Sequence, residues 1–104
     1  MRVMFLGNYA PNAVKGLIQG SDREAAGRTL VESVGGKFVS ITFTRGVYDV
    51  ILTADVPNQA SSMGLAMAIR ASGSFLDVCV LEQLDMTPVI AAAQKATKSY
   101  KPPG

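Results

Sequence analysis

The sequence predicts an α+β domain whose strands and helices follow in the order βαββαβ, with one further helix at the C-terminus. Two runs rich in Val, Ile, Phe, Thr and Tyr, residues 37–44 and 47–56, are separated only by Arg45-Gly46, as in a β-hairpin. Segments of helical periodicity flank this hairpin on both sides, and a further apolar, strand-like run lies beyond each of them. The length of 104 residues suits one domain.

A two-residue turn at Arg45-Gly46 predicts the register of the hairpin. Gly46 can adopt the positive φ that a tight turn requires. The register places three apolar pairs on one face: Phe43 with Tyr48, Ile41 with Val50, and Val39 with Leu52. Thr42 then lies opposite Asp49 on the other face. A bulge at Gly46 is the alternative, and it would shift the register by one residue and change the pairing of the faces.

The remaining elements follow from apolar runs, capping residues and helix breakers. Strands are predicted at 1–8 and 75–84, and helices at 13–19, 21–34, 59–72 and from Asp85 or Thr87 to about Lys98. In the second helical segment, Ser21 and Glu24 form a predicted capping box, and Ala26, Leu30 and Val34 form the face expected to pack on the sheet. We expect Gly35 to end that helix in the left-handed conformation.

Two features near the C-terminal half allow more than one interpretation. The helix at 59–72 is apolar nearly all round, which favours a core helix over a pocket lined by Met63 and Met67. Residues 99–104 contain two prolines, so we expect an extended tail in which Tyr100 docks onto the body.

The topology predicts that one face of the sheet stays bare in a single chain. Right-handed crossovers place the first and third strands at the centre and both crossover helices on one face. The opposite face is not polar enough to meet water. In addition, only 17% of the residues are charged, below the roughly 25% usual in globular domains. We therefore expect a homo-oligomer whose basic unit is a dimer, formed by two sheets packing face to face.

Composition excludes several functional classes. The net charge of +2 and the absence of a basic cluster argue against nucleic-acid binding, and the apolar runs are too short to span a membrane. No signal peptide follows Arg2, and the single cysteine, Cys79, fits a reducing cytoplasm and an inert buried thiol. The chain has no histidine, so the commonest general base, haem ligand and zinc ligand are missing; we expect no metal site and no cofactor.

Asp49 is the one carboxylate placed inside the predicted hairpin strands, which requires a hydrogen-bonding partner for it. The structural interpretation is that Asp49 accepts hydrogen bonds from Thr42 and nearby backbone and braces the hairpin. The functional interpretation is that Asp49 and Tyr48 line a pocket and bind a small polar ligand.

The segment Gly46-Val47-Tyr48-Asp49 matches the Gly-x-Tyr-Asp signature of the GYD-domain family, and the chain resembles that family along nearly its whole length. The supporting stretches are residues 7–11, 31–37, 71–73 and 100–104. The resemblance implies a ferredoxin-like unit of the dimeric α+β barrel type, with one domain at 1–98 and a tail at 99–104. It implies no chemistry. The Gly-x-Tyr-Asp turn is also similar to the hairpin of ligand-sensing domains in amino-acid-responsive transcription regulators, which bind effectors at subunit contacts.

Two functions agree with these observations. The first is a small-molecule-binding or assembly module whose candidate ligand-binding residues are Tyr9, Thr42, Arg45, Tyr48 and Asp49. The second is a cofactor-independent monooxygenase or isomerase, as some dimeric barrels are, in which catalysis would depend on Asp49, Tyr48, Tyr9 or Arg45. The sequence does not decide whether the protein is an enzyme. The expected partners are a second copy of the chain and a small molecule, and neither a nucleic acid nor a membrane.

Overall fold

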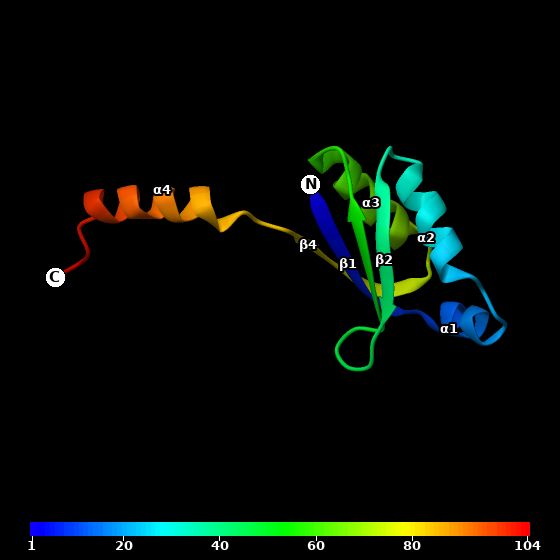
Figure 1. Cartoon of the computed structure of the whole chain (residues 1–104). Helices are drawn as coiled ribbons and strands as arrows, with labels where there is room; N and C mark the ends of the chain where they lie inside the picture. The colour runs from blue at the N-terminus through cyan, green and yellow to red at the C-terminus, as the bar shows by residue number, and fades with distance from the viewer.

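The computed structural model describes all 104 residues and is an α+β fold of four strands and four helices (Figure 1). The elements in chain order are β1 (Arg2–Tyr9), α1 (Pro11–Ile18), α2 (Arg23–Glu32), β2 (Lys37–Phe43), β3 (Val50–Asp55), α3 (Gln59–Ala71), β4 (Phe75–Glu82) and α4 (Met86–Ser99). The predicted order of elements is confirmed, including the two separate helices of the first crossover, α1 and α2.

The four strands form one antiparallel sheet in the order β2-β3-β1-β4. The first and third strands are therefore central, as right-handed crossovers predict. Helices α2 and α3 both pack on the same face of the sheet, where their side chains join those of the strands in one core (Figure 1). The opposite face, which we call the open face, has no covering helix.

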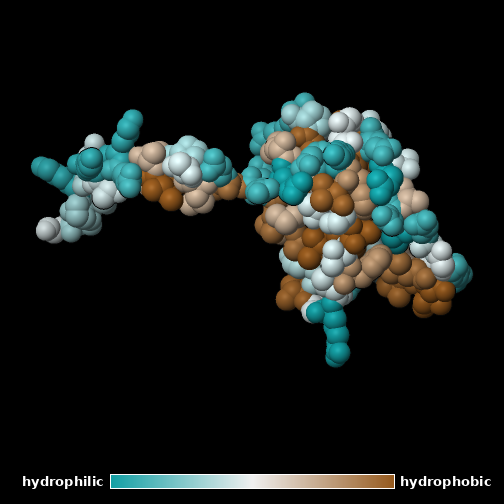
Figure 2. Space-filling view, in the orientation of Figure 1, coloured by the Kyte–Doolittle hydropathy of each residue, from teal (hydrophilic) through white to brown (hydrophobic).

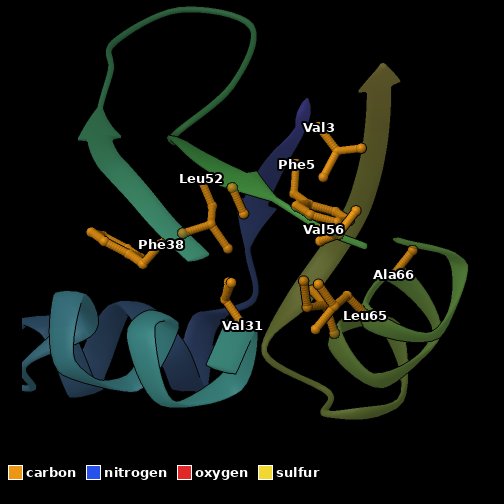
Figure 3. Packing of buried hydrophobic residues seen from close by; sticks show 10 residues of the cluster. Val3, Phe5, Val31, Phe38, Leu52, Val56, Leu65 and Ala66 are labelled. Carbon is orange, nitrogen blue, oxygen red and sulfur yellow. The ribbon is translucent and has the colours of Figure 1, made fainter. Parts of the chain in front are cut away.

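The core lies between the sheet and helices α2 and α3 (Figure 3). Val31 is the residue of α2 that is fully buried there, whereas Leu30 and Val34 pack partly buried at its margin. Ala26 also lies on the side of α2 that faces the sheet, as predicted, where it lines a cavity and stays exposed. The helix comes close to the sheet at Gly27, where an added Cβ would lie 3.3 Å from the Leu52 side chain.

The hairpin register differs from the predicted one by two residues. Phe43 pairs with Val50 and Thr42 with Ile51, so residues 44–49 form a six-residue loop. The loop is longer because the backbone N–H of Asp49 donates to the Gly7 carbonyl of β1 at 3.0 Å, which draws the end of the loop toward the central strand. From Ser40 to Phe43, a shift of two residues keeps each side chain on its predicted face. A bulge in β2 leaves Val39 without a partner in β3, so Phe38 is buried in the core, and Val39, predicted to lie opposite Leu52, is exposed.

Of the three predicted N-caps, those of α3 and α4 are correct and that of α2 is wrong. Asn58 and Asp85 cap α3 and α4 through their side chains. The N-cap of α2 is Asp22, whose Oδ1 accepts from the Ala25 N–H at 3.0 Å, and not Ser21. The Ser21 hydroxyl instead accepts from Arg23 Nε at 2.9 Å. Gly35 has φ +77° after α2, as predicted.

Helix α4 projects from the body as a separate arm (Figure 1). None of its residues is buried, and Tyr100 is 67% exposed, so the prediction that Tyr100 docks onto the body of its own chain is wrong. Met63 and Met67 of α3 are also exposed and do not belong to the core. Figure 2 shows apolar surface on one side of the arm and over much of the visible body.

No helix has the length and apolar character needed to cross a membrane.

Candidate functional site

A cavity of about 220 Å³ lies between the sheet and the two helices that cover it. Strands β1 and β3 provide its apolar floor, and α2 and α3 provide its walls. The apolar residues that line it include Phe5, Leu30, Leu52, Ile69, Phe75 and Val78. The cavity is the gap that remains because α2 and α3 lie side by side over the sheet without filling the space between them.

Tyr9 lines one end of this cavity from the last position of β1. Its ring stacks on Phe75, with a centroid separation of 4.9 Å and an interplanar angle of 27°. Burial raises the pKa of Tyr9 above its ordinary value, against the opposing influence of Arg23, and the Asp49 carboxylate raises it further. The phenol is therefore neutral at physiological pH and can both donate and accept a hydrogen bond.

The close packing of Phe75 beside β1 depends on Gly7. A Cβ atom at this position would lie 2.6 Å from the Phe75 ring. Gly7 therefore leaves the space that the ring occupies while it stacks on Tyr9, and it fixes the shape of this end of the cavity.

Arg23, in the first turn of α2, is the cation of the site. Its Nε donates to Ser21, and its guanidinium takes part in neither of the two ion pairs of the molecule, which are Arg2–Asp55 and Arg28–Glu24. Two serines from the end of α3 and the turn after it also line the cavity, Ser72 and Ser74. The site thus combines an apolar interior with a cation, a neutral phenol and hydroxyl groups.

Asp49 braces the loop against β1 and does not line the cavity. Its Oδ2 accepts from the backbone N–H of Tyr9 at 2.9 Å, and its carbonyl accepts from the Thr44 N–H at 2.9 Å. The predicted partner, Thr42, is not bonded to it and lies opposite Ile51. The carboxylate therefore holds the backbone of the tyrosine whose ring closes the cavity.

Tyr48 lies at a different place, beside the open face of the sheet. An interaction with the Cys79 side chain raises the pKa of Tyr48, and the Asp77 carboxylate acts in the same direction. Cys79 follows Val78, which faces the cavity, so its side chain points to the other face. The adjoining Val47 carbonyl accepts from the Asn8 side-chain amide at 2.9 Å, which fixes the loop there.

The structure thus separates the five candidate residues. Tyr9 lines the cavity, with Asp49 bonded to its backbone, whereas Tyr48 and Thr42 belong to the open face and Arg45 is exposed in the loop. Arg23 and Phe75 were missed by the sequence analysis. Arg23 lies within the segment that was interpreted as a capping box, between Ser21 and Glu24. The one signal for a site was its position at the start of a helix expected to cover the sheet.

The strand order and the helix-covered face define a ferredoxin-like α+β protein with an apolar cavity between helices and sheet. The GYD domain family model matches residues 4–93, so the chain belongs to the GYD-domain family. The matched region includes most of β1, the other three strands, the cavity and the first half of α4. A search of curated proteins finds no match to the chain.

Proposed function

We propose that the protein is a small-molecule-binding module and that its ligand occupies the cavity between the sheet, α2 and α3. The observation that carries this proposal is the pairing of an apolar interior with a guanidinium, Arg23, that has no carboxylate partner in the protein. Ligand sites are typically apolar with a few polar groups that fix orientation. The volume of about 220 Å³ favours a compact ligand, smaller than a typical drug.

The polar groups indicate the chemical class of the ligand. Arg23 suits an anion, and a guanidinium binds a carboxylate in a bidentate manner. The Tyr9 and Ser74 hydroxyl groups can hydrogen-bond the ligand as well. The Ser72 hydroxyl already donates to the Ile69 carbonyl and accepts from the Ser74 N–H. We propose a small aromatic or aliphatic carboxylate with its apolar part against Phe5 and Leu52.

The alternative of a cofactor-independent monooxygenase or isomerase gains no support from this geometry. Of the four residues on which catalysis would depend, only Tyr9 lines the cavity. Asp49 accepts a hydrogen bond from the Tyr9 backbone and lies outside the cavity lining, and so do Tyr48 and Arg45.

We further propose that the module works as a homodimer in the cytoplasm. The support for the dimer is the open face, where Met4, Leu6, Ile51 and Leu81 have no covering element. Cys79, the single cysteine, has no second thiol in the chain to pair with, which supports a reducing compartment.

Binding of simple probes tests the cavity directly. Calorimetry with benzoate and hexanoate, beside their uncharged amides, compares ligands of similar size that differ in charge. We expect the carboxylates to bind more tightly and Arg23→Gln to weaken their binding about tenfold, as expected for the loss of one charge-assisted hydrogen bond. The matched control is Arg28→Gln, which removes a guanidinium from the same helix that lies over Phe38 outside the cavity. Equal binding of acids and amides, or equal losses in both variants, would contradict the proposal. Mass spectrometry of ligands that co-purify with the native protein would identify the natural one.

A further inference from the structure

Helix α4 has a clear apolar stripe that contacts nothing in its own chain. Met86, Val89, Ile90 and Ala93 recur at three- and four-residue spacing, and Tyr100 continues the same side beyond the helix. Lys95 and Lys98 lie on the opposite side. Met86 and Ile90 are each half exposed, so a binding partner could bury further apolar area on both side chains.

A helix of this length is marginal in water by itself. Isolated helices shorter than about 12–15 residues are barely stable even with favourable sequences. Helix α4 has 14 residues and one side-chain cap, from Asp85. Its amphipathic pattern therefore indicates that packing against another surface stabilises it.

The surface area of the chain indicates how large that partner surface is. A compact protein of 10.9 kDa exposes about 5,600 Å², whereas this chain exposes 7139 Å². The radius of gyration is 17.7 Å, against about 13 Å for a compact chain of this length. The excess of about 1,500 Å² per chain is comparable with the area that one subunit buries in an obligate dimer.

The junction between β4 and α4 directs the arm away from its own sheet. Only residues 83–85 separate the two elements. The backbone N–H of Gln83 donates to the Arg2 carbonyl at 2.9 Å, which keeps the chain running in the direction of β4 up to the start of the arm. A short linker held in this way favours a partner that lies beyond the end of the sheet.

A receiving groove lies between α3 and β4, beside the point where the arm leaves. It is lined by Met63, Ala66, Met67 and Val80, with Arg70 and Glu82 at its border. Methionine side chains adapt well to a docked apolar helix. Residues 86–104 carry three lysines and no acidic residue, and residues 1–85 carry eight acidic and seven basic residues, so no excess of positive charge on the body repels the arm.

We infer that α4 is an exchanged arm: in a dimer, each α4 leaves its own subunit and packs its apolar stripe into the Met63–Met67 groove of the second copy. The exchange is isologous, because each subunit gives one arm and receives one. It adds contacts to those of the open face and is independent of what the cavity binds.

The first test compares two substitutions of equal charge on opposite sides of α4. Ile90→Lys places a charge in the stripe, and Ala91→Lys places the same charge on the outer side. Sedimentation equilibrium at micromolar concentration should give twice the 10.9 kDa mass for the wild type and for Ala91→Lys. The dimer dissociation constant of Ile90→Lys should rise at least tenfold. A monomeric wild type, or the same dissociation constant in both variants, would overturn the inference.

The second test locates the arm. Two chains, one with Met63→Cys and the other with Ile90→Cys, both with Cys79→Ser, are mixed and treated with a short bismaleimide. Exchange predicts a cross-linked heterodimer, with much less product when Ala91→Cys replaces Ile90→Cys. Cross-linking only within one chain that carries both cysteines would show that the arm folds back. Monomers that sediment with anionic phospholipid vesicles would show that the basic helix binds a lipid surface. Either result overturns the inference.

Discussion

The Oδ2 atom of Asp49 accepts a hydrogen bond from the backbone N–H of Tyr9 at 2.9 Å, which ties the loop between β2 and β3 to the central strand. The same tyrosine stacks on Phe75 and closes one end of the cavity. The Gly-x-Tyr-Asp segment therefore contributes to the site through its aspartate, which positions a residue of the cavity wall.

Replacing Asp49 by Asn should destabilise the protein by about 1–2 kcal/mol, because the amide oxygen can still accept from Tyr9 but the charge is lost. Asp49→Ala should cost more, since the Tyr9 N–H then loses its acceptor in a buried residue. Urea denaturation measures both changes. Glu32→Gln, at an exposed site without a hydrogen bond from its side chain, is the control. If Asp49→Asn were as stable as the wild type, the Asp49 carboxylate would not stabilise the loop against β1.

Gly36→Ala and Gly16→Ala should change stability in opposite directions. At Gly36 the new Cβ would lie 2.8 Å from Val31 Cγ1 and 3.0 Å from the Asp55 carbonyl oxygen, so the substitution should cost about 1–3 kcal/mol. Gly16 lies inside α1 with no atom within 4 Å of the new methyl group, and alanine there should stabilise by about 0.5–1 kcal/mol. Thermal unfolding of the two variants measures both changes. Losses of equal size would show that the residues around Gly36 move aside for the added methyl group.

The cap of α2 can be tested by comparing neighbouring residues. Asp22→Ala removes the side chain that accepts from the Ala25 N–H and should cost about 1 kcal/mol. Ser21→Ala removes only an exposed contact with Arg23 and should have a clearly smaller effect on the free energy of unfolding. If Ser21→Ala were the more damaging change, the capping box expected from the sequence would be restored.

Stability should fall in acid through the ion pair between Arg2 and Asp55, whose Nε and Oδ1 atoms are 2.9 Å apart. The hydrogen bond from Arg2 holds the pKa of Asp55 below its ordinary value of 3.8, so the unfolded chain takes up this proton first as the pH falls. The stabilising contribution is complete above pH 3.8 and is lost as the pH drops through the lower folded pKa. Urea midpoints of wild type and Asp55→Asn should therefore converge in acid. Both side chains are partly exposed, so salt should also reduce the difference. Parallel midpoints across the whole pH range would exclude this role.

The order of the elements and the central position of β1 could be predicted because they follow from local patterns and crossover handedness. Apolar residues on both faces of β1 and the cap at Asn58 need no knowledge of distant contacts. The hairpin register could not be predicted in this way. It depends on the hydrogen bond from the Asp49 N–H to the Gly7 carbonyl. Gly7 precedes Asp49 by 42 residues, so the residue pattern of the hairpin gives no sign of this bond.

The site was predicted only in part for the same reason. Tyr9 was found because it is one of the few side chains left for chemistry in a chain without histidine. Arg23 and Phe75 become wall residues only once α2 lies over the sheet and Gly7 admits the ring. The complete burial of Val31, near the close approach of α2 to the sheet at Gly27, likewise follows from packing that residue spacing does not reveal.

The two outer strands of the sheet differ in their tendency to recruit foreign strands. The bulge near Val39 interrupts β2, and such irregularity hinders the addition of another strand. Strand β4 also has an irregularity, at Leu76, which has no partner in β1. Beyond it, residues 77–82 pair with β1 without interruption, whereas β2 is regular only over residues 40–43; the outer edge of β4 is unpaired, and Leu81 is exposed. Aggregation of the monomer should therefore begin at β4, and a lysine placed on that edge would improve solubility more than one placed on β2.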